Sequence, residues 1–220
     1  WLVVLFGLMI VPLGAISIFF IVIQPIVIGT WCTLCLVAAL AMLLQIPYSL
    51  DELLATGQFL VRRRRQGRSL LRVFLHGDGE REGERTGPTD FEQPAGAIVR
   101  DMLGGGINLP WNLVACALIG VWLMSTRVTL GTAAPMADAD HLIGALVVTI
   151  SVTALAEMAR PARFLNALAG ACLLGTPFMF DGGSALAEAL SLLAGVLLIV
   201  LSIPRGRVRH RYGDWNRFIF

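Results

Sequence analysis

Charge is missing from long stretches of this chain, and that absence excludes an ordinary soluble domain. Residues 1–23 contain no charged side chain, and 56% of the 220 residues are hydrophobic. Further uncharged apolar runs follow at 26–50, 111–126, 142–156, 164–180 and 189–203. About 20 consecutive apolar residues span the hydrocarbon core of a bilayer. The sequence therefore predicts an all-α integral membrane protein of about six transmembrane helices, although two of the shorter runs could instead be re-entrant or interfacial.

Lysine is absent as well, so all 17 basic residues are arginines. Most of them fall in three predicted loops, at 62–72, 160–163 and 205–211. If six helices alternate in direction, these loops lie on one side, and the other side receives only Arg127 and three aspartates. Arginine-rich loops are retained in the cytoplasm. We therefore expect cytoplasmic termini and an outward-facing turn between the first two helices.

Several motifs are also missing, and each absence argues against a class of function. No second C-x-x-C and no nearby histidine pair accompanies the single C-x-x-C, which disfavours a four-ligand zinc site. The glycine run 104–106 follows no strand and precedes no Gly-Lys-Ser/Thr, so it is not a phosphate loop. No predicted span carries an ionisable group at mid-depth, where transporters place coupling sites. A small transporter is therefore disfavoured.

The single C-x-x-C, formed by Cys32 and Cys35, lies where the first apolar segment gives way to the second. Pro25 and Gly29 interrupt the chain just before it, so both cysteines are expected in the first turn of the next helix. Unpaired N–H groups and the helix dipole favour a thiolate there, most strongly at the first cysteine. Residues three apart also share a helix face. The pattern predicts a redox-active dithiol on the outer side, and buried structural cysteines are the alternative.

Other polar or reactive residues in the apolar segments have less specific interpretations. Ser17 and Gln24 need a partner, which is either another helix or the polar head of a lipid-soluble ligand. Trp31 suits either an interfacial aromatic belt or a flat ligand stacked beside Cys32. Cys116 and Cys172 are expected to be buried core residues.

The remaining titratable residues near span ends are interpreted as solvated or interfacial groups. The three histidines, His76, His141 and His210, show no metal-ligand spacing and are expected to be solvated. Glu157 and Arg160 are expected to form an interfacial pair.

Charge and glycine content divide the chain into four predicted segments. Residues 1–60 form a helical hairpin, and residues 61–107 form a cytoplasmic linker, flexible around 77–95. Residues 108–205 form two tandem hairpins, and residues 206–220 form a cytoplasmic tail.

An internal repeat supports the tandem hairpins. Residues 143–147 resemble residues 194–198 at an offset of 51, and residues 118–120 resemble residues 173–175 at an offset of 55. Small residues run through these segments, which predicts close contact between helices in lipid.

Two resemblances follow from these residues. Residues 29–36 (GTWCTLCL), after a helix containing Ser17, resemble the last part of bacterial vitamin K epoxide reductase family proteins. That resemblance implies a helical bundle in the bacterial inner membrane that passes electrons from secreted-protein thiols to a quinone. It implies Cys32 as the thiol that exchanges with a shuttle disulfide and Cys35 as the thiol facing the quinone. It also implies that Ser17 lines the quinone pocket, and Trp31, from its place beside Cys32, is the second candidate for binding the quinone.

The second half resembles the SPW repeat, a membrane module named for a Ser-Pro-Trp motif. Pro110 and Trp111 retain only Pro-Trp of that motif, and Arg163 and Phe164 occupy about the same place in the second unit.

The chain also departs from the reductase family pattern. That family encloses its quinone in four helices and uses another cysteine pair as a shuttle, whereas only two such helices are present here and no cysteine precedes Cys32. We expect the missing elements upstream of Trp1. The expected partners are membrane lipids, a quinone of the ubiquinone or menaquinone type, and either secreted thiol proteins or an upstream shuttle pair, with no nucleic acid among them. The alternative function is a non-enzymatic membrane scaffold or partner-binding module with structural cysteines.

Overall fold

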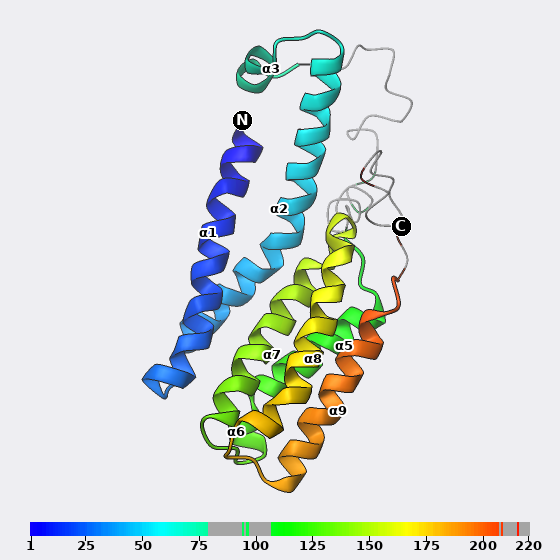
Figure 1. Ribbon diagram of the computed structural model, residues 1–220. Coiled ribbons are helices and arrows are strands. Elements are labelled where there is room, and N and C mark those ends of the chain that lie inside the picture. The colour runs from blue at the N-terminus through cyan, green and yellow to red at the C-terminus, as the bar shows by residue number, and fades with distance from the viewer. Residues whose placement is uncertain (79–93, 95, 97–106, 207, 209–214, 216–220) are drawn as a thin grey trace.

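A computed structural model describes residues 1–78, 94, 96, 107–206, 208 and 215, and within them every regular element is a helix. The all-α class is therefore confirmed. An N-terminal hairpin consists of α1 (Leu2–Ile23) and α2 (Thr33–Arg65), with the short α3 (Leu70–His76) after it. Four helices then form a bundle beside the hairpin (Figure 1). They are α5 (Trp111–Met124), α7 (Met136–Thr153), α8 (Arg163–Met179) and α9 (Ala185–Ser202). The part of the predicted linker expected to be flexible, 77–95, falls almost entirely outside the described residues, as do residues 104–106 and His210.

Four of the described helices are long and apolar enough to cross a membrane. They are Leu2–Ile28, Thr33–Arg65, Met136–Thr153 and Ala185–Ser202. The helix α5 has only 14 residues, so at 1.5 Å per residue it covers roughly 21 Å, less than the ~30 Å hydrocarbon core. The predicted count of six spans is therefore not confirmed, because two of the apolar runs form shorter helices than their hydropathy suggests.

The bundle is built from two hairpins that each close around a pair of glycines. Gly120 of α5 meets Gly144 of α7, and Gly170 of α8 meets Gly195 of α9. A Cβ added to Gly144 would lie 2.5 Å from the carbonyl oxygen of Gly120, and one added to Gly170 would lie 2.6 Å from that of Gly195. Backbones this close require residues without side chains. The expected close contact between helices is confirmed.

These contacts correct the alignment of the two repeats. The offset of 51 holds for the second helix of each hairpin, because Gly144 and Gly195 occupy equivalent places. The predicted offset of 55 for the first helix is wrong, because Gly170, rather than Gly175, is the equivalent of Gly120. The resulting offset of 50 also superposes Thr126 on Thr176, whose hydroxyls donate to the carbonyls of Leu123 and Leu173.

The corrected alignment explains why the two mid-helix cysteines differ. Cys116 is 0% exposed in the bundle core with Leu123, Leu173 and Leu198, so its burial is confirmed. Cys172 is exposed, and the expectation that it is buried is wrong. It lies two residues after Gly170, which places it about 200° around α8, away from the helix that Gly170 contacts.

The turn after α1, the short α6 (Thr126–Thr129) and the connection from α8 to α9 all lie at one end of the molecule (Figure 1). At the other end of the bundle, the short 3-10 helix η3 (Glu157–Ala162) joins α7 to α8. Glu157 and Arg160 both lie in η3 and are fully buried there. The predicted dithiol is therefore at the end opposite to η3 and α3.

Candidate functional site

The chain between α1 and α2 forms a tight turn whose shape follows from two residues. A π-helix, η1 (Gln24–Ile28), continues α1 and contains Pro25. Gly29 then adopts a φ of 73°, a left-handed conformation that glycine reaches without steric cost. Pro25 thus lies where α1 changes to η1, and Gly29 ends the helix, so the predicted interruption just before the cysteines is confirmed. We refer to residues 24–35 as the dithiol turn.

Cys32 is the N-cap residue of α2, and Cys35 lies in the first helical turn. The Sγ atom of Cys32 accepts a hydrogen bond from the backbone N–H of Cys35 at 3.5 Å. The backbone N–H of Cys32 donates to Oε1 of Gln24 at 3.0 Å. Gln24 is only 4% exposed, so its partner is the dithiol turn itself. The expected place of both cysteines at a helix start is confirmed.

The two thiols have different surroundings. Cys32 is exposed and Cys35 is half-buried. Hydrogen bonds from Cys35, from its side chain first and from its backbone N–H second, hold the pKa of the Cys32 thiol below its ordinary value. A thiolate is the nucleophilic form of cysteine. The geometry therefore makes Cys32 the more accessible and more readily ionised of the two sulfurs.

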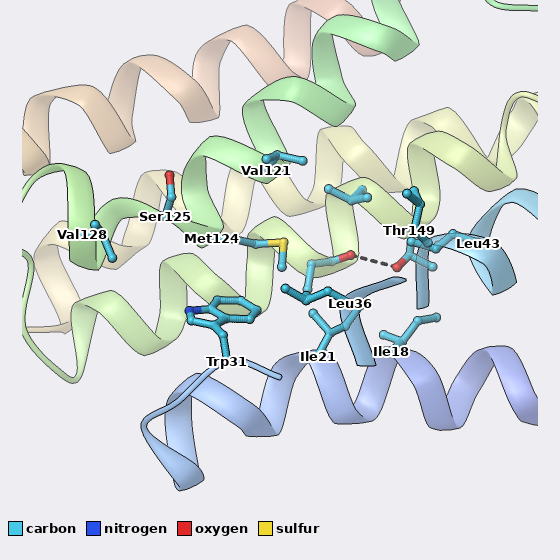
Figure 2. A pocket seen from close by; sticks show the side chains of 13 residues that line it. Ile18, Ile21, Trp31, Leu36, Leu43, Val121, Met124, Ser125, Val128 and Thr149 are labelled. Atoms are coloured by element: carbon cyan, nitrogen blue, oxygen red, sulfur yellow. Dashed lines mark hydrogen bonds between the residues drawn. The ribbon is translucent and has the colours of Figure 1, made fainter. Parts of the chain in front are cut away.

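A groove of about 360 Å³ runs between the N-terminal hairpin and the bundle (Figure 2). Its lining residues come from α1, α2, α5, α6, α7 and the dithiol turn. They are Ile18, Ile21, Trp31, Leu36, Leu40, Leu43, Val121, Met124, Ser125, Val128, Ala145, Val148 and Thr149. This volume is within the range of small-molecule sites. Trp31 lines the groove, as one of its two interpretations requires, whereas Ser17 is half-buried elsewhere on α1.

The groove is apolar in its hydrogen-bonding capacity as well as in composition. The hydroxyl of Thr149 donates to the carbonyl of Ala145 at 2.8 Å, and that of Ser125 donates to the carbonyl of Trp122 at 2.7 Å. Both hydroxyl protons are therefore already used within the helices. The groove suits an apolar or aromatic ligand, and Trp31, a residue that is 42% exposed, offers an aromatic surface for stacking.

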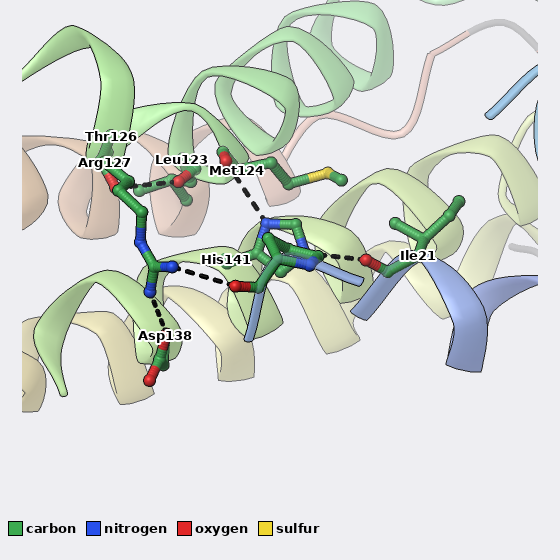
Figure 3. A network of polar contacts seen from close by, with 8 residues as sticks. Ile21, Leu123, Met124, Thr126, Arg127, Asp138 and His141 are labelled. Carbon is green, nitrogen blue, oxygen red and sulfur yellow. Dashed lines mark hydrogen bonds and ion pairs between the residues drawn. The ribbon is translucent and has the colours of Figure 1, made fainter. Parts of the chain in front are cut away.

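Polar contacts hold the N-terminal hairpin against the bundle at the same end (Figure 3). Nε2 of His141 lies 3.0 Å from the carbonyl oxygen of Ile21, and its Nδ1 lies 3.3 Å from that of Met124. Arg127 donates to the carbonyl of Pro25 at 3.0 Å and pairs with Asp138. His141 is 4% exposed, so the expectation that it is a solvated histidine is wrong.

A local signal existed for part of this network. In an α-helix the carbonyl of Ile21 would accept from the N–H of residue 25, which is a proline and has none. The sequence thus shows that this carbonyl needs an outside donor, but it does not show which residue supplies it. His141 is 120 positions from Ile21, and Arg127 is 102 positions from Pro25.

Comparisons with known proteins bear on one half of the chain. No curated protein and no solved structure matches it. The family match below does not include the N-terminal hairpin, so the resemblance of the hairpin to the vitamin K epoxide reductase family stays a prediction. Residues 110–204, which contain all four helices of the bundle, match the SPW repeat domain, as predicted for this half.

Proposed function

We propose that the dithiol turn catalyses thiol–disulfide exchange and passes the electrons to a membrane quinone. The observation that supports this most is the capped position of Cys32: an exposed sulfur, with a lowered pKa, held over the N-terminus of α2. Reactive cysteines occur in such positions because the N–H groups there stabilise the thiolate. Cys35, half-buried and one turn further on, is the natural second thiol.

The exchange requires two thiols of a substrate protein and the oxidised form of the pair. One substrate thiolate attacks Sγ of Cys32, a substrate–Cys32 disulfide forms, and Cys35 leaves as a thiolate. The second substrate thiolate then attacks the substrate sulfur, which releases a substrate disulfide and reduced Cys32. The enzyme pair has gained two electrons and the substrate has lost two.

The residues of the groove fit the apolar part of a quinone. Its walls are aliphatic, and Trp31, directly before Cys32 in the chain, provides an aromatic face. A bound quinone would accept the two electrons and two protons that restore the Cys32–Cys35 disulfide. The chain's own contribution is to hold the ring by stacking and aliphatic contact and to keep water from it.

The quinone requirement can be tested by trapping thiols with a maleimide mass tag. The full-length protein is reduced in liposomes, freed of reductant, and incubated with or without a short-chain ubiquinone or a menaquinone. We expect quinone to make Cys32 and Cys35 resistant to the tag, while Cys116 and Cys172 react equally in both samples. A tagging pattern of Cys32 and Cys35 that ignores both quinones would exclude the proposal.

We further propose that Cys32 faces the outside of a bacterial inner membrane. The concentration of arginines in loops at the opposite end supports this orientation. An impermeant maleimide applied to intact cells is expected to label Cys32 after reduction. A cysteine introduced at the exposed position Arg72, within α3, is the matched control and is expected to react only after the cells are opened. The reverse pattern would invert the topology.

A second candidate function is a non-enzymatic scaffold. It is favoured by one observation, that the sulfur of Cys32 already serves as the cap of α2 and therefore has a structural role. In that case function would depend on the residues that join the N-terminal hairpin to the bundle. It would not depend on the redox state of Cys32 and Cys35.

A further inference from the structure

We infer that the SPW-like bundle positions the dithiol turn, with His141 and Arg127 as the positioning residues. This inference rests on the proposed function only in treating Cys32 as the reacting thiol. It gives the repeats a role that neither the family match nor the resemblance assigns.

The first contact between the bundle and the dithiol turn is made at the end of α1. The carbonyl of Ile21 has no α-helical donor because residue 25 is proline, and Nε2 of His141 lies 3.0 Å from it. An unpaired buried carbonyl is costly. The same imidazole contacts the carbonyl of Met124, at the end of α5, where helix carbonyls lack partners. The imidazole, on α7, thus lies between the end of α1 and the end of α5, and in its neutral form it donates to one of the two carbonyls.

The second contact is made with the π-helix η1. Arg127, at the start of α6, donates to the carbonyl of Pro25 and is oriented by Asp138 of α7. A guanidinium donates in several directions at once. It can therefore satisfy the carboxylate and the carbonyl together, which ties the dithiol turn to two elements of the bundle.

The third contact lies directly beside the reacting thiol. The indole of Trp31 lies edge-on to the ring of His141, with centroids 5.3 Å apart and planes at 70°. Edge-to-face pairs of this kind are favourable. Trp31 precedes Cys32 in the chain, so a contact that fixes its ring also restricts the backbone of Cys32.

These three contacts together determine the N-cap position of Cys32. Gln24 lies between the two held carbonyls of α1 and η1, and its Oε1 accepts the N–H of Cys32. Trp31, the residue before Cys32, restricts the backbone of Cys32 through its contact with His141. Together they place its sulfur where the N–H of Cys35 can donate to it. Loosening the bundle contacts should therefore weaken the interaction that favours the Cys32 thiolate.

The test measures the alkylation rate of reduced Cys32 against pH, resolved by mass spectrometry, in full-length protein in liposomes. His141→Phe keeps a flat ring beside Trp31 but removes both carbonyl contacts. We expect it to slow alkylation at pH 7 roughly threefold and to move the half-maximal pH upward, because the thiolate is the reactive form. Arg127→Gln, which removes the guanidinium that satisfies Asp138 and the carbonyl of Pro25 together, is expected to act in the same direction. His141→Gln, which retains an N–H donor for one carbonyl, is expected to stay near the wild-type profile.

Two substitutions at the opposite end serve as controls. His76→Phe and Arg72→Gln make the same chemical changes near α3 and are expected to leave the profile unchanged. A loss of folding alone lowers the melting temperature without moving the pH profile of the molecules that remain folded. If His141→Phe fails to fold, Arg127→Gln decides the question.

The outcomes separate the inference from the proposed function. Profiles of His141→Phe and Arg127→Gln that match wild type would overturn the positioning role, whatever quinone does. An equal change in the controls would overturn it as well. A shifted profile in a protein whose thiols ignore quinone would support positioning and reject the oxidoreductase.

Discussion

Replacing Cys32 by serine is expected to abolish thiol exchange while leaving the start of α2 intact. Serine is a preferred N-cap residue, and its hydroxyl can accept the N–H of Cys35 as the sulfur does. Stability should therefore change by less than about 0.5 kcal/mol. The exchange rate should fall by roughly three orders of magnitude, because the attacked sulfur is gone. Oxidation of a dithiol peptide by protein in quinone liposomes measures the rate, and thermal unfolding measures the stability.

The matched control is Cys172→Ser, which changes an exposed cysteine on α8. It is expected to keep both the rate and the melting temperature. Cys35→Ser is expected to be inactive in the same assay, because it cannot form the Cys32–Cys35 disulfide that the substrate thiolate attacks. If Cys32→Ser retained the wild-type rate, the cysteines would be structural and the scaffold function would be preferred.

Replacing Gly144 by alanine is expected to destabilise the bundle by about 1–3 kcal/mol. The new Cβ would lie 2.5 Å from the carbonyl oxygen of Gly120 and 2.9 Å from Cβ of Leu123. Neither atom can rotate away, because one belongs to the backbone and the other is the first atom of a buried side chain. Helices α5 and α7 would have to separate, and unfolding followed by circular dichroism in detergent measures the loss.

Gly57→Ala provides the control for helix propensity. Gly57 lies in α2 with nothing within 4 Å of an added Cβ. Alanine there removes backbone freedom from the unfolded chain and should stabilise the protein by up to about 1 kcal/mol. Equal melting temperatures for the two variants would show that α5 and α7 do not meet at Gly144.

The parts of this fold that were predictable have local causes. Pro25 and Gly29 end a helix wherever the rest of the chain lies, so the position of Cys32 at a helix start could be inferred from the sequence. The small residues of the bundle likewise indicate close helix contact. Hydropathy also identified the apolar segments, although α5 is too short to confirm a full span.

The parts that were not predictable depend on partners distant in sequence. His141 resembles any histidine at a span end until Ile21, 120 residues earlier, is placed beside it. The repeat offset was misread for a similar reason: short apolar strings match at several registers, and only the contact between Gly170 and Gly195 selects one. Cys172 then turned out to be exposed because that register turns it outward.

The two repeats of the bundle differ at the positions whose side chains fix the N-terminal hairpin. At the corrected offsets, the second repeat carries Pro177, Ala189 and Leu192 where the first carries Arg127, Asp138 and His141. None of these three side chains has a hydrogen-bond donor for a backbone carbonyl. The equivalent edge of the second repeat therefore cannot bind another helical hairpin through the same side-chain hydrogen bonds. A fold made of two similar units therefore offers this set of side-chain contacts at one edge only.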